Sequence, residues 1–509
     1  MKIFLMTFGL LLSLILGSCN AALPRYQQTP SYVQQYDSDN QLAQTVAKLR
    51  ADMPASNSAV YPLSDGMAAF IARVTLIRAA ESSIDLQYYI YRGDETGVIL
   101  TAALIEAADS GVRVRMLLDD LPNKGGDQGM QLLNAHPNIE VRLFNPFVNR
   151  SFRGLEMAGS FDRINRRMHN KSLTIDNLAT VVGGRNIGDE YFAADAELEF
   201  GDFDLLAVGP VVPQVSEQFD LYWNHQYAVP VKELIPQTKS NQQLSKARKQ
   251  FMASIKSLEE REYVERLRQS KMLRDIERGD LEWFTGPAKA VYDLPSKMDQ
   301  EASAEQSFMV QQMAEVWDGL NHQVLFISPY FVPMQAGVDI LLDMVAQGVD
   351  VTVVTNSLAA TDVVAVHAGY QKYRKALLAG GVKLYESKVN PSHRPSAWKG
   401  SSRASLHAKA FVLDKRKVYV GSFNIDPRSA ALNTEMGLLI DSPMLAEKLL
   451  SGESNLPTTT YRLSLDTEND QLIWLDDATG EQYYSEPDAS IWRRLGAIII
   501  SWLPIETML

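Results

Sequence analysis

The chain has 509 residues, of which 46% are hydrophobic and 22% are charged, and its formal net charge is −12. This length exceeds one ordinary domain, and the composition is that of a globular protein with enough apolar sequence for two cores. The acidic balance argues against generic nucleic-acid binding, and the single cysteine excludes an intramolecular disulfide.

The first residues are typical of a secretory signal peptide. Lys2 precedes an apolar run over 3–15, and Leu-Gly-Ser-Cys then ends at Cys19. Because this run is short for a membrane span, we expect a signal peptide over 1–18. The four residues resemble the lipobox of bacterial lipoproteins, which implies a lipidated Cys19 on the periplasmic side of a membrane. Asn20 favours the outer membrane over the inner one. An ordinary hydrophobic anchor with an incidental cysteine is the alternative.

Residues 19–60 are rich in Gln, Ser, Tyr and Pro and show little apolar periodicity before 42–49. This composition predicts a flexible spacer that runs into a short helix. Such a tether suits an enzyme that works on the membrane holding it. An untethered disordered tail fits the composition equally well.

The first α/β domain is expected over 61–235. Residues 83–91 have the composition of a strand, 97–109 carry an apolar stripe at helical spacing, and 111–119 form the next strand. A strand–helix–strand unit of this size predicts that the two strands pair in parallel.

One pattern occurs twice in the chain at identical spacing. It consists of a histidine, a lysine two residues later, an aspartate, and a Gly-rich turn that ends in asparagine. The copies are His169, Lys171, Asp176, Gly183, Gly184 and Asn186, then His407, Lys409, Asp414, Gly421, Ser422 and Asn424. On a strand, the histidine and the lysine project from the same face. Imidazole can act as nucleophile or general acid, and ammonium and amide groups can hold phosphoryl oxygens. The two copies therefore predict one phosphate site built from two half-sites.

A helical insert is expected over 236–300, because apolar residues recur among many charges from 244 to 276. We expect two helices there. They either pack on their own domain, which is the more usual outcome, or face a membrane.

The second α/β domain is expected over 301–448. Strand 324–330, helix 337–347 and strand 348–354 repeat the order of the first domain, and a further helix follows over 362–378. The distance from the start of this last strand to the second motif almost equals that in the first copy. The repeat is therefore a whole domain.

The two motifs resemble the paired HKD motifs of the phospholipase D superfamily. The strings 424–429 and 433–435 most resemble bacterial cardiolipin synthases, and the resemblance covers about 60–441. It implies an α/β fold of two domains related by a pseudo-twofold axis, with the active site at their interface. It also implies cofactor-free chemistry. No zinc-ligand spacing and no nucleotide-binding glycine motif occurs in the sequence, so we expect no metal and no cofactor.

An acidic residue stands at the same place after each motif. Asp202 lies eight residues before Pro210, and Glu435 lies eight residues before Pro443. Equivalent acids in both halves suggest one carboxylate for each histidine. In the superfamily such an acid binds the distal ring nitrogen and fixes the tautomer. Two solvated acids at strand ends are the alternative.

The resemblance implies roles for the motif residues. His169 is expected to be the nucleophile and His407 the general acid and base, although the near symmetry leaves the reverse open. The cationic and amide groups would bind the substrate phosphate: Lys171, Asn186, Lys409 and Asn424. Asp176 and Asp414 belong to the family's catalytic motif, but we interpret them as structural because they fall five residues beyond the lysines.

The C-terminal extension is expected over 449–509, with short strands followed by an apolar stretch at 491–505. This stretch is too short to cross a bilayer, so it either lies at a membrane interface or forms a buried helix.

The leading functional hypothesis is phosphatidyl transfer that makes cardiolipin. Its partners are then a membrane surface and phospholipids, namely phosphatidylglycerol and possibly phosphatidylethanolamine, without nucleic acid. The alternatives are a hydrolytic phospholipase D, a lipid-binding protein without catalysis, and a nuclease, which the acidic charge and the tether disfavour.

Overall fold

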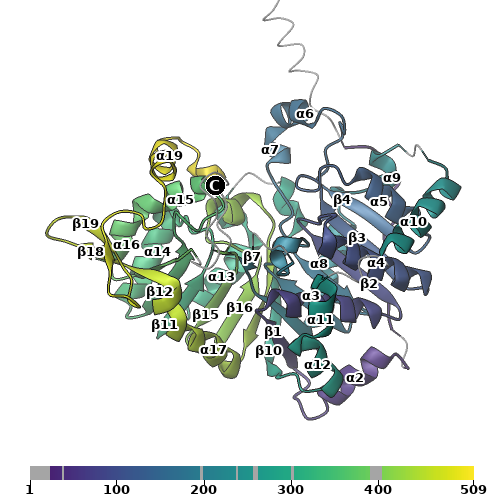
Figure 1. The fold of residues 1–509 in the computed structure, drawn as a ribbon, viewed down its shortest axis with the longest axis horizontal. Coiled ribbons are helices and arrows are strands. Elements are labelled where there is room, and N and C mark those ends of the chain that lie inside the picture. Colours follow the sequence, from purple (N-terminus) through teal and green to yellow (C-terminus); the bar gives the residue numbers. More distant parts are fainter. Residues whose placement is uncertain are drawn as a thin grey trace, which may run out of the picture.

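The structure is a computed structural model that describes residues 23–36, 39–194, 199–236, 239–255, 262–299, 303–389 and 404–509. Its main feature is a single mixed sheet of eighteen strands, flanked by helices (Figure 1). The sheet has two halves with the same internal order, which meet at the antiparallel pair β1 (Asn57–Leu63) and β10 (Phe284–Tyr292). This architecture is the α/β fold with two related domains that the sequence predicts.

The first half of the sheet runs inward from its outer edge to β1. Each strand is hydrogen-bonded to the next. In spatial order the strands are β9 (Ala228–Pro230), β4 (Ile139–Phe144), β3 (Arg113–Asp119), β2 (Ser83–Tyr88), β5 (Ser172–Ile175), β6 (Ala179–Gly183), β8 (Asp204–Val208) and β1.

The second half repeats this order outward from β10 and adds two strands at its edge. In spatial order the strands are β10, β17 (Met436–Asp441), β16 (Lys417–Gly421), β15 (Ala410–Leu413), β11 (Gln323–Ile327), β12 (Asp350–Asn356), β13 (Lys383–Ser387), β18 (Thr460–Asp466), β19 (Gln471–Leu475) and β20 (Gln482–Tyr483).

The predicted parallel pairs are confirmed in both halves. β2 pairs in parallel with β3, and β11 pairs in parallel with β12. Each pair is joined by a helix, α4 (Glu95–Asp109) in the first half and α14 (Met334–Ala346) in the second. Parallel strands need such a crossover, because a tight turn can only reverse the chain.

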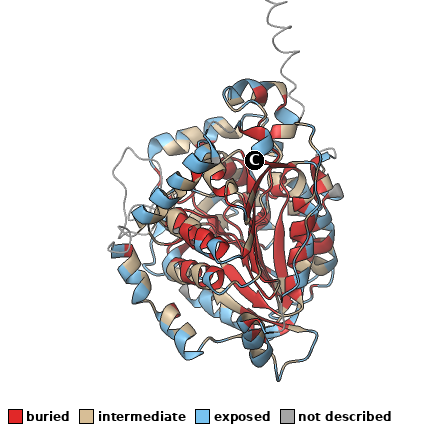
Figure 2. Ribbon diagram, turned by 90° about the vertical axis from the view of Figure 1, so that its right-hand side faces the viewer, coloured by how far each residue is buried: buried red, intermediate tan, exposed pale blue. Residues whose placement is uncertain are grey.

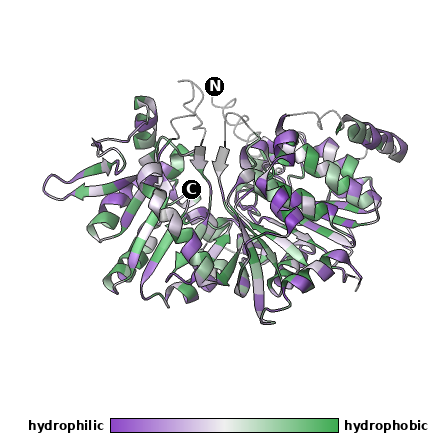
Figure 3. Ribbon diagram, turned by 60° about the horizontal axis from the view of Figure 1, so that its bottom comes forward, coloured by the Kyte–Doolittle hydropathy of each residue, from purple (hydrophilic) through white to green (hydrophobic). Residues whose placement is uncertain are grey.

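The other helices cover the sheet. Figure 2 shows the strands and the inner faces of the helices as buried, and Figure 3 shows hydrophobic residues concentrated along the strands. Separate buried clusters fill the two halves, and a third cluster joins them beneath β1, β10 and β17. The longer helices are α2 (Gln41–Leu49), α3 (Gly66–Arg78), α5 (Asp127–Asn134), α8 (Val211–Trp223), α13 (Phe308–Trp317) and α17 (Pro443–Leu450). The shorter ones are α6 (Arg153–Gly159), α7 (Phe161–Ile164), α9 (Val231–Leu234), α15 (Val364–Tyr370), α16 (Arg374–Ala379) and α18 (Leu456–Thr459).

The insert contains three helices in its described part, whereas we expected two. They are α10 (Asn241–Ile255), α11 (Glu262–Arg268) and α12 (Lys271–Arg278). Tyr263 and Met272 join the core of the first half, and Tyr263 donates a hydrogen bond to the Phe192 carbonyl at 2.9 Å. The insert therefore packs on its own half. The interval expected for the insert also contains β10, which belongs to the sheet.

The segment expected to be a flexible spacer is held against the first half over 23–36. Tyr26 donates to the Ala228 carbonyl, the Val33 amide donates to Asp220, and the Ser31 carbonyl accepts from Arg115. Such irregular backbone pairing leaves no periodic pattern in a sequence, so composition alone suggested a spacer. The signal peptide and Cys19 lie outside the described residues. Within the described part of the chain, no helix is long and apolar enough to cross a membrane.

Candidate active site

Each motif histidine lies on a segment that pairs with the opposite half of the molecule. The His169 amide donates to the Thr434 carbonyl at 2.9 Å, and the Thr434 amide donates to the Arg167 carbonyl at 2.9 Å. In the other copy, β14 (Ala404–Leu406) pairs in parallel with β7 (Glu199–Gly201). The His407 amide then donates to the Gly201 carbonyl at 2.8 Å. These crossed pairings bring both motifs to the interface between the halves.

The crossing gives each histidine the acid of the other half. The Nδ1 atom of His169 lies 2.9 Å from a Glu435 carboxylate oxygen, and that of His407 lies 2.6 Å from Asp202. Both acids are buried. Sequence spacing predicts one acid for each histidine, but it carries no information on which acid meets which ring. With Nδ1 bound to a carboxylate, the tautomer is set and Nε2 points away from the acid.

The two acids differ in their electrostatic setting. Burial raises the pKa of Glu435 to about 7, against the opposing effects of Lys171 and Ser422. Burial also pushes the pKa of Asp202 upward, but His407 and Lys409 outweigh it and lower that pKa to about 2. Hence Asp202 is an anion at neutral pH, while Glu435 is poised between its two forms.

Both histidines are neutral at rest near pH 7. Burial lowers the pKa of His169 well below its usual value, and Lys171 and Lys409 lower it further. Burial and Lys409 lower the pKa of His407, while Asp202 opposes that shift. A neutral imidazole has the lone pair that a nucleophile or a general base needs.

Both motif lysines are buried beside their histidines. Lys171 Nζ donates to the His169 carbonyl at 2.6 Å, and Lys409 Nζ donates to the His407 carbonyl. Burial lowers the pKa of Lys171 to about 7, although Glu435 opposes it, and burial also lowers the pKa of Lys409. A bound phosphate anion would offset the cost of burying these positive charges. The two lysines therefore form a site that favours an anion.

The two motif asparagines have different surroundings. Asn424 is buried, and its Oδ1 atom has no hydrogen-bond partner among the described residues. Asn186 instead accepts from the Ile90 amide at 3.1 Å and donates to Tyr191 Oη at 2.9 Å. Tyr191 in turn lies edge-on to His407, with ring centroids 5.4 Å apart. Part of the Asn186 amide thus positions an aromatic wall of the site.

The motif aspartates tie down backbone rather than contacting the histidines. Asp176 accepts from the amides of residues 81–83 at 2.7–2.9 Å. Asp414 accepts from the amides of residues 321–323 at 2.8–3.1 Å. Each aspartate has a positive φ, in the turn between β5 and β6 or between β15 and β16, and fastens that turn to the start of β2 or β11.

Several contacting residues were not singled out from the sequence. Tyr89 lies edge-on to His169, with ring centroids 5.0 Å apart, and Ser422 donates to Glu435. Arg167 forms a buried ion pair with Asp119, which also accepts from the Met168 amide and so fixes the approach to His169. Tyr89 and Asp119 fall at the ends of predicted strands, where side chains at the carboxyl edge of a sheet often line a site. Only that weak positional signal could have found them.

Comparisons with known proteins show the family of the chain. The family model described as "Cardiolipin synthase, PLD-like domain" matches residues 74–223 and 318–452. Cardiolipin synthase C of Escherichia coli is 39% identical over 482 residues, which cover 92% of this chain and 99% of that protein. The chain belongs to the phospholipase D superfamily, among its cardiolipin synthase-like enzymes. The major cardiolipin synthase ClsA of Bacillus subtilis is 26% identical over 78% of this chain and 68% of its own length.

Among solved structures, this phospholipase D-like chain is similar to the phosphatidylserine synthase of Haemophilus influenzae. The TM-score is 0.56 at 14% identity, over 88% of this chain and 95% of that one. At this identity the likeness establishes the fold. Within the described residues, no group of His, Cys, Asp or Glu side chains has the arrangement of a metal site.

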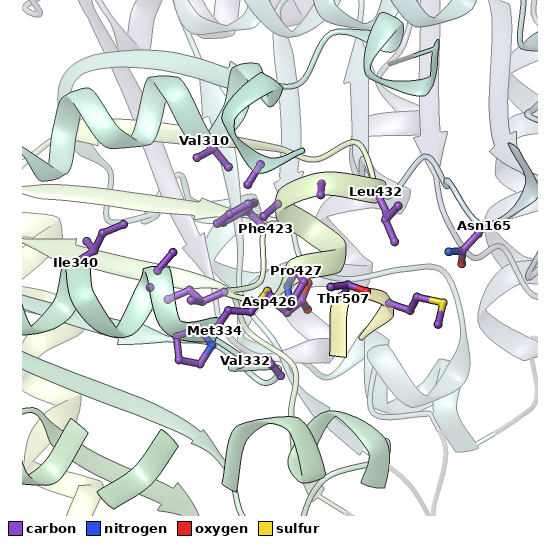
Figure 4. A pocket seen from close by; sticks show the side chains of 18 of the residues that line it. Asn165, Val310, Val332, Met334, Ile340, Phe423, Asp426, Pro427, Leu432 and Thr507 are labelled. Atoms are coloured by element: carbon purple, nitrogen blue, oxygen red, sulfur yellow. The ribbon is translucent and has the colours of Figure 1, made fainter. Parts of the chain in front are cut away.

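A cavity of about 600 Å³ adjoins the second motif of this enzyme. Its walls come from α14, from the stretch after Ser422, from α7 of the first half and from the C-terminal turn η9 (Glu506–Met508). Figure 4 shows Met334, Ile340, Phe423, Leu432 and Thr507 around it. Most of the lining is apolar, with Asp426 among the few polar groups, so the cavity fits hydrocarbon better than it fits a charged group.

Proposed function

We propose that the protein is a cardiolipin synthase that transfers a phosphatidyl group from one phosphatidylglycerol to the headgroup hydroxyl of another. The main support is the crossed pair of histidine–carboxylate units, with both lysines beside them, in a chain that is similar to cardiolipin synthase C over 92% of its length. Phosphatidylethanolamine is a second candidate donor, because the motif residues are assigned to the phosphodiester and none of them is assigned to the headgroup.

In the first step, Nε2 of His169 attacks the phosphorus of the donor lipid. The bond from phosphorus to the headgroup oxygen breaks. His407 takes up a proton once the anionic phosphodiester lies beside it, and it gives that proton to the leaving glycerol. The product is a phosphatidyl group bound to His169. Burial and the two lysines lower the pKa of His169, which keeps that ring unprotonated and suits it to act as the nucleophile. The ionised Asp202 suits His407 to carrying the proton, because it stabilises the imidazolium.

In the second step, His407 takes the proton from the hydroxyl of a second phosphatidylglycerol. That oxygen attacks the phosphorus, the bond from phosphorus to His169 breaks, and cardiolipin leaves. We assign Lys171, Lys409 and Asn424 to binding the phosphoryl oxygens, on which charge gathers during the transfer. Donors that are already in place in a buried site stabilise such charge without reorganising.

The competing functions use the same first step. With water as the acceptor the product is phosphatidic acid, as in a hydrolytic phospholipase D. The apolar cavity beside the second motif favours a lipid over a nucleic acid substrate. The completeness of both histidine–carboxylate pairs argues against a lipid-binding protein that has lost catalysis. For the cellular setting we propose a lipoprotein anchored through Cys19 to the periplasmic side of a membrane, the outer one by the residue at position 20.

The test is a lipid assay with the purified mature chain and vesicles of phosphatidylglycerol, with and without phosphatidylethanolamine. We expect cardiolipin and glycerol to accumulate, and both to be absent with His169→Ala. Phosphatidic acid as the main product would show that the enzyme hydrolyses the lipid instead of transferring the phosphatidyl group. If the protein turns over neither of the two lipids, the proposal is wrong. Ethanolamine release would identify the second donor, and mass spectrometry of the mature N-terminus would test the lipid on Cys19.

A further inference from the structure

The last long helix, α19 (Ile491–Ser501), turns its apolar side toward solvent. Trp492 is 79% exposed, Ile499 is 57% exposed, and Trp502, directly after the helix, is 78% exposed. The exposed apolar residues recur at helical spacing and form one stripe, which we call the α19 stripe: Ile491, Trp492, Leu495, Ile498, Ile499, Trp502 and Leu503. A helix on a soluble domain normally buries such a stripe.

The polar groups of α19 point the other way. Arg493 donates to the carbonyls of Leu358 and Thr361, and Arg494 donates to the Glu486 carbonyl. Ala497 is buried against α15. These hydrogen bonds anchor α19 to the rest of the protein with the α19 stripe facing solvent.

The loop that holds α19 also acts on the active site. Arg493 grips the loop that ends at Asp362, and the Asp362 carboxylate is close enough to favour protonation of His407. The first half has a second exposed apolar surface, which we call the α6–α7 rim. On α6 and α7, Phe152, Leu155 and Phe161 face solvent just before the segment that leads to His169. Figure 1 shows α19 and the α6–α7 pair on the same upper side of the molecule, one over each half.

We infer that the α19 stripe and the α6–α7 rim together form the surface by which the protein docks on a phospholipid bilayer, with the active site facing the lipid. This inference rests on the proposed function, since it assumes that the substrate lies in a bilayer.

The composition of the surface selects lipid as its occupant. Tryptophans near both ends of an apolar stripe are typical of helices that lie in the plane of a membrane interface. The cavity beside the second motif also reaches this side, because Phe161 and Met508 both line it and are both exposed. A lipid lifted from a docked bilayer would thus meet apolar walls before its phosphate reaches the histidines.

The first experiment locates α19 without relying on turnover. The full chain is reconstituted with phosphatidylglycerol vesicles whose acyl chains carry bromine, which quenches tryptophans that enter the bilayer. We expect strong quenching in the parent protein and loss of most of it in Trp492→Phe/Trp502→Phe, which keeps the apolar surface but removes the reporters. Trp283→Phe is the matched control and should be quenched like the parent, because Trp283 is partly buried and packs against Tyr61 of β1. Unchanged quenching without Trp492 and Trp502 would overturn the inference, as would a second copy of the chain covering the stripe.

The second experiment separates docking from chemistry. Ile498→Asp/Ile499→Asp places charge in the stripe, and we expect its turnover of vesicle phosphatidylglycerol to fall at least about tenfold. Turnover of short-chain phosphatidylglycerol dissolved as monomers should stay within about twofold of the parent, since no bilayer is needed. Met444→Asp is the control, because Met444 is 67% exposed and its helix α17 lies at the lower edge of Figure 1, on the side away from α19.

Equal losses on both substrates would overturn the docking role. If the parent turns over neither substrate, the proposed function fails, while tryptophan quenching still reports whether α19 enters the bilayer.

Discussion

The two halves of the active site have the same geometry and different acids. In one, His169 is bound by the longer Glu435, which also accepts from Ser422. In the other, His407 is bound by the shorter Asp202, which lies against Gly184 where its counterpart has Ser422. A Cβ atom at Gly184 would lie 2.2 Å from Asp202 Oδ1, so that position has no room for a side chain. The shorter acid and the glycine thus replace the longer acid and the serine as a unit.

The difference shows how a duplicated site can divide its work. Asp202 stays ionised and can stabilise a histidine that carries a proton. In the proposed mechanism Glu435, with its pKa near 7, supports the nucleophilic histidine, which must stay neutral until it attacks. Pairs of equivalent groups whose pKa values are pushed apart are a recurring way to assign acid and nucleophile roles.

Removing each histidine in turn is the strongest test of this division. His169→Ala should lower turnover of phosphatidylglycerol by about 10⁴-fold or more, and so should His407→Ala. The two variants should differ with a lipid whose leaving group is p-nitrophenol, which needs no proton. His407→Ala should then still release one equivalent of p-nitrophenol in a rapid burst, whereas His169→Ala should release none. Stopped-flow absorbance measures the burst.

Reversal of this pattern would exchange the two roles. The structure provides a control in His136, which is buried on the first half away from the motifs and bonds Asp109. His136→Ala should retain both the burst and the steady-state rate for each correctly folded molecule.

Opposite effects on stability are expected when the two acids are neutralised. The pKa of Asp202 in the folded state, about 2, lies below its usual value, so its charge stabilises the fold above that usual value. Asp202→Asn should therefore lower the free energy of unfolding by about 2 kcal/mol near neutral pH. Glu435 has a folded-state pKa of about 7, above its usual value, so its charge costs stability as the pH rises toward 7. Glu435→Gln should remove a penalty of about 3 kcal/mol at mildly alkaline pH, less what its lost hydrogen bonds contributed.

Denaturant unfolding at mildly acidic and mildly alkaline pH measures both effects. The stability of Glu435→Gln relative to the parent should increase between the two conditions, and that of Asp202→Asn should stay lower in both. If both variants change the free energy of unfolding in the same direction at mildly alkaline pH, the two acids do not differ in their electrostatic setting.

Much of this arrangement was accessible from the amino-acid sequence. The spacing from His169 to Asn186 is repeated from His407 to Asn424, and the distance to the preceding strand is nearly the same in both copies. The repeat therefore extends beyond the motif and predicted two related α/β domains. The positions of Asp202 and Glu435 before Pro210 and Pro443 predicted one acid for each histidine. These features depend on local order along the chain, which periodicity records.

The features that escaped prediction depend on contacts between distant segments. Glu435 meets His169 only because residues 167–169 pair with Thr434, and no local pattern encodes that pairing. The Asn186 oxygen likewise accepts from the Ile90 amide, which lies 96 residues earlier in the chain. For 491–505 the sequence showed an apolar stretch that could lie at a membrane interface or form a buried helix. The hydrogen bond from Arg493 to the Leu358 carbonyl fixes which side of α19 faces outward.

The motif aspartates are expected to matter for stability and not for chemistry, and more in the first half. Asp176 is buried and accepts from Asn40 in addition to backbone amides, whereas Asp414 lies nearer the surface. Unpaired amides cost more in a buried place. Asp176→Asn should therefore lower the free energy of unfolding by about 2 kcal/mol, and Asp414→Asn by about 1 kcal/mol. Turnover by the folded fraction, measured well below the melting temperature, should stay near that of the parent. A large loss of turnover in a fully folded variant would give these aspartates a direct role.

The smallest expected effect concerns Ser422, whose counterpart in the first half is Gly184. Ser422 donates to Glu435 and so favours the ionised carboxylate that fixes the His169 tautomer. In Ser422→Ala the pKa of Glu435 should rise, by about one unit for the loss of one hydrogen bond to a charged group. Turnover near pH 7 should then fall about fivefold, because less Glu435 is ionised, and should recover as the pH rises. The measurement is the acid limb of the pH–rate profile. Ser216→Ala, which removes a buried serine bonded to Asn177 instead, should leave that limb in place. If Ser422→Ala also leaves it unmoved, Glu435 does not control the acid limb, and the two halves differ in shape without differing in charge.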